Sequence, residues 1–152
     1  MLKDVPLEEW AKAWSTEDPE RLVGRGHPVG DFLAADRWVV LEREPGRLRV
    51  RCALVEAVRN PKGELFGGFT PTYVDFFALF VFHQSRAADE PRQWLATTHL
   101  RVDYFAPVQG PEFEMAGHVV HKRDRSAHVE IRFEAGESLC ALAHATLLER
   151  KS

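Results

Sequence analysis

The sequence has little of what marks exported, membrane-spanning or disulfide-stabilised proteins. It has two cysteines, Cys52 and Cys140, in strand-like segments with no second cysteine nearby, which indicates neither a disulfide framework nor a zinc site. The longest strongly apolar stretch, residues 74–82, is far too short to span a membrane and contains Asp75. The first residues, MLKDVPLEEW, do not resemble a signal peptide. We therefore expect a cytoplasmic protein with no membrane partner.

The chain also lacks a strong excess of charge and the common cofactor motifs. A formal net charge of −3 over 152 residues argues against a nucleic-acid partner, and the length fits one domain. There is no phosphate loop, dinucleotide fingerprint or Ser-His-Asp order. His118 and His121 are three residues apart in a strand-like segment, so we expect them on opposite faces. The sequence predicts neither a metal site nor a redox cofactor.

Residues 1–35 predict an N-terminal helical extension. Asp4 can cap a helix that has Pro6 in its first turn and continues through LEEWAKAW, which places Trp10 and Trp14 on one face. The proline- and glycine-rich sequence that follows predicts short helical turns and loops. We expect this extension to pack as a lid or flank on the rest of the protein.

Residues 36–152 predict the main domain, which is rich in strands. RWVVLERE and RLRVRCALVE flank a turn at Pro45-Gly46, and apolar and arginine residues alternate in the second segment, as in a hairpin with one buried face. Four more strand patterns follow: ATTHLRVDYF, EFEMAGHVVHK, AHVEIRFE and LCALAHATLLE. We expect an antiparallel sheet of about six strands, arranged as a meander in which each strand lies beside the next.

The segment from Gly67 to about Gln84 breaks this pattern, because apolar side chains cover every face at helical spacing. Such a helix is a buried helix. An antiparallel sheet wrapped around one long central helix satisfies both patterns, so the predicted fold class is α+β.

The start of this helix holds the candidate chemistry. Pro71 favours a helix start at Gly67 or Gly68, which leaves the glycine amides free to bind a developing oxyanion or a phosphate. Asp75, two turns later among apolar residues, is a candidate general base or nucleophile. Two other interpretations stay open: the glycines form only a tight turn, and Asp75 is a structural residue bonded to a neighbouring strand.

The spacing of these two residues predicts a shared site. Gly67 and Asp75 are about 12 Å apart along the helix axis and about 80° apart around it, so one helix cannot bring both to one carbonyl. If both serve one reaction, Gly67 of one subunit meets Asp75 of another across a two-fold interface. We therefore expect catalysis to require a dimer.

These segments resemble hotdog-fold acyl-CoA thioesterases, in the branch of the phenylacetate-pathway thioesterases and the mammalian acyl-CoA thioesterases similar to them. The resemblance covers roughly residues 36–149 and is carried by NPKGELFGG, THLRVDYFAP and ALAHATLL. It implies a hotdog fold, hydrolysis of an acyl-CoA thioester without a separate cofactor, and sites between subunits of a homodimer or of a homotetramer made from two dimers.

The resemblance also implies roles for individual residues. Asn60 and the Gly67 amide would polarise the thioester carbonyl, Asp75 would be the base or nucleophile, and Thr97 would orient the attacking water. One departure is Phe66, which stands where the family commonly has a histidine just before the paired glycines. Phe66 could instead shape the acyl pocket, although aromatic residues at such positions are more often simple core.

The predicted contacts with coenzyme A lie in three places. The first is the glycine turn, with Phe66 and Gly68. The second is the segment beside which the pantetheine would run, made of Tyr104, Phe105, Ala106 and Pro107. The third is the basic hairpin turn HKRDRS, where Arg123 and Arg125 could hold a phosphate, with His121, Lys122 and Ser126 beside them. A solvated hairpin tip is the alternative for this turn.

Two other functions compete with hydrolysis. The absent histidine motivates a non-catalytic protein that binds or senses acyl-CoA on the same scaffold. A hotdog dehydratase is disfavoured, because those enzymes pair a histidine with an acid in a motif that the sequence lacks.

Overall fold

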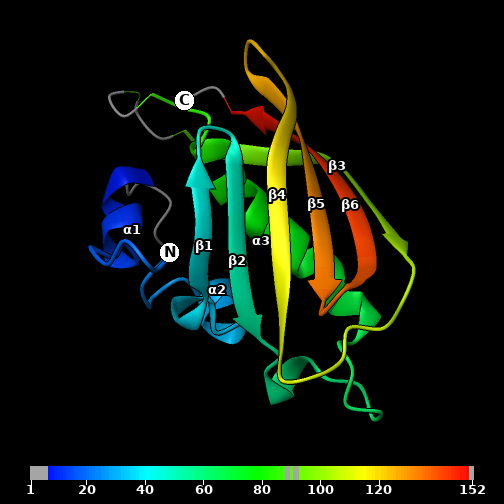
Figure 1. Ribbon diagram of the computed structural model, residues 1–152. Helices are drawn as coiled ribbons and strands as arrows, with labels where there is room; N and C mark the ends of the chain where they lie inside the picture. The colour runs from blue at the N-terminus through cyan, green and yellow to red at the C-terminus, as the bar shows by residue number, and fades with distance from the viewer. Residues whose placement is uncertain (1–6, 88–89, 91–92, 151–152) are drawn as a thin grey trace.

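The computed structural model describes residues 7–87, 90 and 93–150. Figure 1 looks onto a six-stranded antiparallel sheet with one long helix, α3, behind it. The strands are β1 (Val39–Glu44), β2 (Arg47–Ala53), β3 (Leu95–Tyr104), β4 (Glu112–Arg123), β5 (Ser126–Ala135) and β6 (Ser138–Glu149). The helices are α1 (Leu7–Ala13), α2 (Pro28–Phe32) and α3 (Thr70–His83), with short 3-10 turns at Ala35–Arg37, Glu56–Val58 and Gly67–Phe69. The predicted α+β architecture and all six strands are confirmed.

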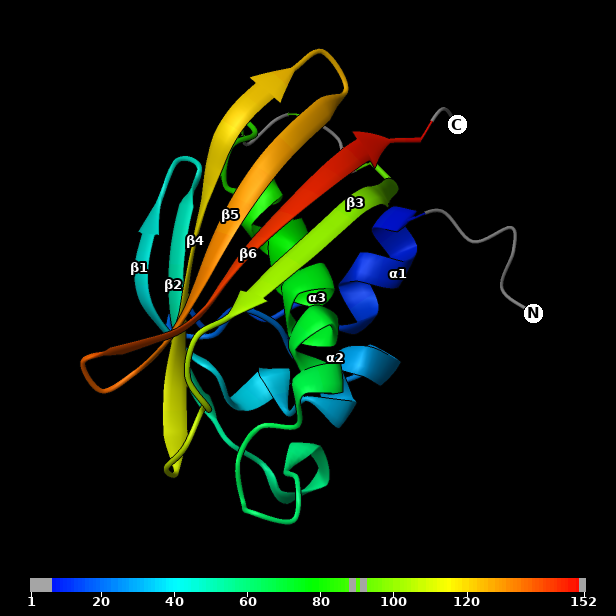
Figure 2. The same ribbon diagram turned by 90° about the vertical axis from the view of Figure 1, so that its right-hand side faces the viewer.

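The order of the strands differs from the expected meander. The sheet runs β1-β2-β4-β5-β6-β3, so β3 lies at the far edge and β4 returns to pair with β2. The reason is α3, which crosses the concave face of the sheet and delivers the chain to the edge opposite the β1-β2 hairpin (Figure 2). The meander prediction was wrong because it treated the helix as an insertion between neighbouring strands.

The core forms where the sheet faces α3. Every second residue of β5 is buried, from Ala127 to Phe133, as the two-residue period predicts. On α3, Tyr73 stacks on Trp38 at 5.9 Å between ring centroids and meets the Phe113 ring edge-on at 5.3 Å. The predicted cluster of aromatic side chains is therefore mostly core.

Close approach between helix and sheet depends on one glycine. A Cβ atom at Gly117 of β4 would lie 2.5 Å from Cγ2 of Val81 and 3.0 Å from Cε1 of Phe77. Any side chain at this position would push α3 away from the sheet.

Residues 7–33, which contain α1 and α2 and are called the N-terminal segment below, lie on the side of α3 that faces away from the sheet (Figure 2). α1 ends one residue before Trp14, whose ring centroid lies 5.6 Å from that of Trp10, so the expected tryptophan face is present. The predicted cap Asp4 and the predicted first-turn Pro6 lie outside the described residues. Among the described residues, no helix combines the length and apolar character needed to cross a bilayer.

One prediction about the histidines was wrong. A bulge in β4 between Val119 and His121 shifts the alternation by one residue, so that His118 pairs with Glu130 and His121 pairs with His128. His128 and Glu130 share the outer face of β5, and the two β4 histidines therefore share that face as well. Within the described residues, no group of three or more histidine, cysteine, aspartate or glutamate side chains is arranged to hold a metal ion.

Candidate active site

The loop before α3 is held by its own hydrogen bonds. Oδ1 of Asn60 accepts from the backbone N–H groups of Lys62 at 2.9 Å and Glu64 at 3.0 Å, and the Asn60 N–H donates to the Glu64 carbonyl at 2.7 Å. The Arg59 guanidinium donates to the carbonyls of Leu54 and Gly63, each at 2.8 Å. The Asn60 side chain therefore organises the loop through Oδ1, and its amide group is left to donate elsewhere.

This loop delivers two exposed glycines to the start of the helix. The 3-10 turn begins at Gly67, within the predicted range, and α3 follows from Thr70. In the described part of the chain, neither the Gly67 nor the Gly68 N–H donates to a protein acceptor. The Tyr104 hydroxyl donates to the Gly67 carbonyl at 2.6 Å, which braces the turn against the end of β3. The two amides thus face solvent at the positive end of a helix.

Phe66 covers one side of this turn. Its side chain is 51% exposed and meets Phe69 edge-on at 5.6 Å, and Phe69 in turn contacts Phe32 of α2 at 5.5 Å. A Cβ atom at Gly68 would lie 2.8 Å from the Phe66 ring, so the ring lies directly against this glycine. An apolar surface therefore lies beside the free amides, at the position where the family that the sequence resembles commonly has a histidine.

Asp75 lies one and a half turns into α3 and is exposed in the single chain. The Thr97 hydroxyl, on β3, donates a hydrogen bond to Oδ1 of Asp75. The carboxylate opens into a hollow of about 480 Å³ that lies between α3, β3 and the segment around His27. Asp75 is thus not enclosed by its own subunit, although it does bond to the neighbouring strand as the structural interpretation expected.

The glycine turn and Asp75 do not meet within one chain. Neither Gly67 nor Gly68 lines the hollow that contains Asp75. The hollow is bounded by β3 through Thr97 and Leu100, and β3 is an edge strand whose outer side has no strand beside it in the described residues. An unpaired edge is a template for pairing with a second chain.

The predicted CoA contacts fall at opposite ends of α3. Tyr104 touches Gly67, and the exposed Phe105 follows it. The Phe105 and Ala106 N–H groups donate to the Cys140 carbonyl, and the Cys140 thiol donates to the Pro107 carbonyl. The hairpin tip from His121 to Ser126 lies at the other end (Figure 2).

The basic tip is well exposed. The exposed side chains of this tip include those of His121, Lys122, Arg123 and Arg125. Nζ of Lys122 lies 5.4 Å from the Phe82 ring centroid, near the end of α3. β4 spans 12 residues, or roughly 35–40 Å, between the two ends. The tip and Gly67 of one chain are therefore separated by about the length of β4.

His27 is a residue of this region that was not predicted from the sequence. Its ring caps α2, because Nδ1 accepts from the N–H groups of Val29 at 3.2 Å and Gly30 at 3.3 Å. The ring also meets Trp14 at 5.0 Å and Phe76 at 5.1 Å, both edge-on. Burial lowers the pKa of His27, against the opposing effect of Asp31. The available signal was the His-Pro pair, since a capping side chain followed by proline is a helix start.

Comparison with known proteins adds independent findings. A family model described as the thioesterase superfamily matches residues 62–141, just over half of the chain. No curated protein matches the sequence.

Three solved structures illustrate the similarity. A conserved protein from Pseudomonas aeruginosa has 20% identity and a TM-score of 0.69, with 82% of this chain and 95% of that chain covered. A mutant of the phenylacetic acid degradation protein PaaI from Thermus thermophilus has 22% identity and a TM-score of 0.64, with 82% and 100% covered. A hypothetical thioesterase from Streptococcus pneumoniae, solved with coenzyme A, has 15% identity and a TM-score of 0.64, with 77% and 93% covered. Together with the sheet wrapped around α3, they confirm the expected hotdog fold.

Proposed function

The chain belongs to the thioesterase superfamily, and from this premise we propose that it hydrolyses an acyl-CoA thioester to a carboxylic acid and free CoA. The observation that carries the proposal is the pairing of Asp75 with Thr97 in an open hollow beside the free edge of β3. A carboxylate that is held by one hydrogen bond and open to a cleft is placed to act on a ligand.

The proposed site is made by two subunits. Two chains pair about a two-fold axis along β3, which brings the glycine turn of one subunit to the Asp75 hollow of its partner. The Gly67 amide then donates to the thioester oxygen as negative charge develops there, with the Asn60 amide group as a second donor. The dimer is the unit of activity, and two dimers can form a tetramer without changing the site.

The proposed reaction uses the carboxylate as base or as nucleophile. As a base, Asp75 takes a proton from water, the oxygen of the water attacks the carbonyl carbon, and the C–S bond breaks; the proton then reaches the CoA thiolate. As a nucleophile, a carboxylate oxygen of Asp75 attacks the carbonyl carbon and the C–S bond breaks, which releases the CoA thiolate and leaves an anhydride. Water then hydrolyses the anhydride to the carboxylic acid and free Asp75, and a proton from this water reaches the thiolate. In either case Thr97 fixes the orientation of the carboxylate, and no metal or redox cofactor takes part.

Coenzyme A would extend away from this centre along exposed surfaces. In the proposed dimer, Phe66, Gly68 and the segment Tyr104 to Pro107 flank the pantetheine. The basic tip lies far from Gly67 of its own chain, so the tip that meets the phosphates of a given CoA belongs to the other subunit of the pair. Arg123 and Arg125 supply the charge there.

The test is the Asp75→Asn variant with a panel of acyl-CoAs and thiol detection. We expect kcat/KM to fall by about 10²–10⁴-fold, because the variant keeps the shape and loses the base. The free energy of unfolding should change by no more than about 0.5 kcal/mol, since the side chain is exposed. Cys52 and Cys140 are both buried, and burial raises the pKa of each thiol, so the protein itself should contribute little thiol signal.

Asp18→Asn is the matched control, because Asp18 is exposed and its hydrogen bonds to described residues all lie within the N-terminal loop. It should hydrolyse as fast as the parent protein. An Asp75→Asn protein that also does so would remove Asp75 from the mechanism.

A second candidate is a protein that binds acyl-CoA without hydrolysing it. Phe66 beside the glycine amides favours this candidate, because its apolar ring adds no polar group that could act on the thioester. Such a protein would bind acyl-CoA in calorimetry and release no thiol above the blank with any member of the panel.

A further inference from the structure

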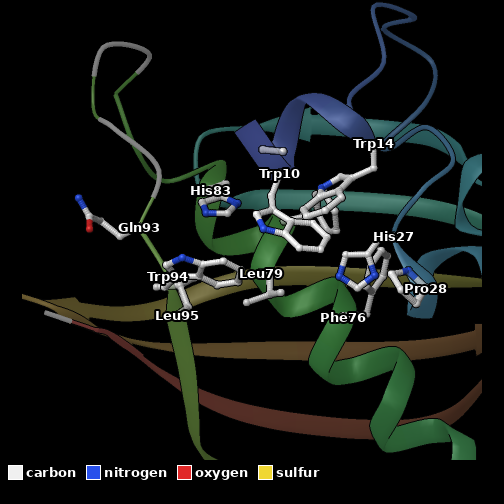
Figure 3. Close-up of a pocket in the computed structure, with 12 residues that line it drawn as sticks. Trp10, Trp14, His27, Pro28, Phe76, Leu79, His83, Gln93, Trp94 and Leu95 are labelled. Carbon is white, nitrogen blue, oxygen red and sulfur yellow. The ribbon is translucent and has the colours of Figure 1, made fainter. Parts of the chain in front are cut away.

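A second cavity opens beside the Asp75 hollow, and the N-terminal segment forms its outer wall. It has a volume of about 230 Å³. Trp10 and Trp14 approach it from the N-terminal segment, Trp94 and Leu95 from the start of β3, and Leu79 from α3 (Figure 3). We call it the tryptophan pocket.

The tryptophan pocket adjoins the proposed catalytic hollow. Both cavities are lined by His27, Phe76 and Leu79, which form the boundary between them. Asp75 and Leu79 are one turn apart on α3, a rise of about 6 Å. An acyl chain attached to a carbonyl at Asp75 therefore reaches the tryptophan pocket within a few bonds.

The chemistry of the wall limits what can enter. Among the described residues, those that line the pocket include no aspartate, glutamate, lysine or arginine, and most of them are aromatic or aliphatic. The surroundings of His27 favour its neutral form: Nδ1 accepts two backbone hydrogen bonds, and burial lowers its pKa. A carboxylate or a phosphate in the pocket would lose its hydration without gaining a cationic partner.

The volume limits the size of the occupant. Apolar cavities of about 150 Å³ stay dry and accept a benzene molecule. The tryptophan pocket is somewhat larger, so it suits a compact group of ring or short-chain size. A long, straight acyl chain would have to leave through the wall.

We propose that the tryptophan pocket binds the acyl group of the substrate, that it selects compact uncharged acyl groups, and that the N-terminal segment determines this selectivity. The proposal rests on the proposed function for the position of the carbonyl at Asp75. From that carbonyl, CoA must follow the polar, exposed route, because its phosphates cannot enter an uncharged pocket. The acyl group takes the remaining direction, past Leu79 toward Trp10.

The test is a specificity ratio, measured with hexanoyl-CoA and acetyl-CoA, since an acetyl group stops short of the pocket. In the Trp10→Ala variant, the ratio of the two kcat/KM values should fall by about tenfold, whereas Trp10→Phe should retain most of it. The parent protein should also prefer hexanoyl-CoA over adipoyl-CoA, which carries a terminal carboxylate, and over palmitoyl-CoA, each by at least about tenfold.

Leu41→Ala is the matched control, because Leu41 is an exposed apolar residue on β1, at the sheet edge opposite β3. Its ratio should equal that of the parent. An equal ratio in Trp10→Ala and Leu41→Ala would overturn the proposal. If Trp10→Ala fails to fold, Leu79→Trp provides the same test from α3, because it fills the pocket and should lower the ratio as well.

Binding separates this inference from the proposed function. Calorimetry with CoA and with the unreactive thioether S-hexyl-CoA needs no hydrolysis. The parent should bind S-hexyl-CoA at least about tenfold more tightly than CoA, and Trp10→Ala should lose most of this preference. A protein with this behaviour and no hydrolysis keeps the pocket and contradicts the proposed activity. Hydrolysis with no hexyl preference in the parent keeps the activity and contradicts the pocket.

Discussion

The two faces of α3 differ in burial and in their predicted role. Toward the sheet, Tyr73, Phe77 and Val81 are completely buried. Toward the N-terminal segment, Leu79 is half-buried and Asp75 is exposed, and both line the hollow. The same 14-residue helix is therefore core on one side and candidate site on the other. A carboxylate in an otherwise apolar helix marks the face that is not core.

The largest stability effect should come from the sheet face. Phe77→Ala removes a fully buried ring and should lower the free energy of unfolding by about 3–5 kcal/mol. Leu79→Ala on the opposite face should cost no more than about 2 kcal/mol, because Leu79 borders open space. Urea denaturation of both variants measures the difference. Equal losses would mean that the two faces are packed alike.

A smaller loss of stability should follow from adding one methyl group to the sheet where it packs against this face of α3. Gly117→Ala places a Cβ atom 2.5 Å from Val81, so helix or strand must shift, at a cost of about 1–3 kcal/mol. Gly67→Ala is the comparison, since its nearest neighbour would be Tyr104 at 3.7 Å, and it should change stability by less than about 0.5 kcal/mol. Thermal unfolding of the two variants measures the difference in stability. A Gly117→Ala protein as stable as the parent would show that α3 and β4 are loosely packed.

The smallest effect on stability should come from His27, which lines the hollow, and it should appear as a pH dependence. Burial lowers the pKa of His27 in the folded protein, so below the ordinary histidine pKa of about 6.5 the unfolded chain binds more protons than the folded one. Stability should therefore fall as the pH falls through about 6.5. His27→Asn keeps a capping side chain that does not titrate, and its melting temperature should fall less over this range. An identical pH dependence in both proteins would assign the effect to other groups.

The sequence allowed the elements of the fold to be predicted, but not their order. Alternation in β5 and the all-apolar helix are local patterns, and both are found. The position of β3 at the far edge depends on how α3 crosses the sheet, which no local pattern records. The bulge after Val119 is similar: one extra residue in β4 placed His118 and His121 on the same face.

The candidate site shows the same limit. Gly67, Asp75 and Thr97 could be named from the sequence and from the family resemblance, and the structure adds the hydrogen bond between Thr97 and Asp75. The tryptophan pocket could not be foreseen. It depends on α1 lying against the C-terminal half of α3, a contact between segments about 70 residues apart.

The central claim is that Gly67 and Asp75 act from different subunits. Gly67→Pro removes the amide hydrogen, and the extended backbone of Phe66 (φ −63°, ψ 125°) accepts a following proline. We expect Gly67→Pro and Asp75→Asn to be inactive separately, and Gly67→Ala, which keeps the amide, to remain active.

The decisive measurement is the activity of an equal mixture of Gly67→Pro and Asp75→Asn subunits after co-expression. Half of the dimers are then mixed, and each mixed dimer has one site with both residues intact, so about a quarter of the parent activity should return. A mixture as inactive as its components would contradict the account, because it would place both residues in a site within one chain or remove one of them from the reaction.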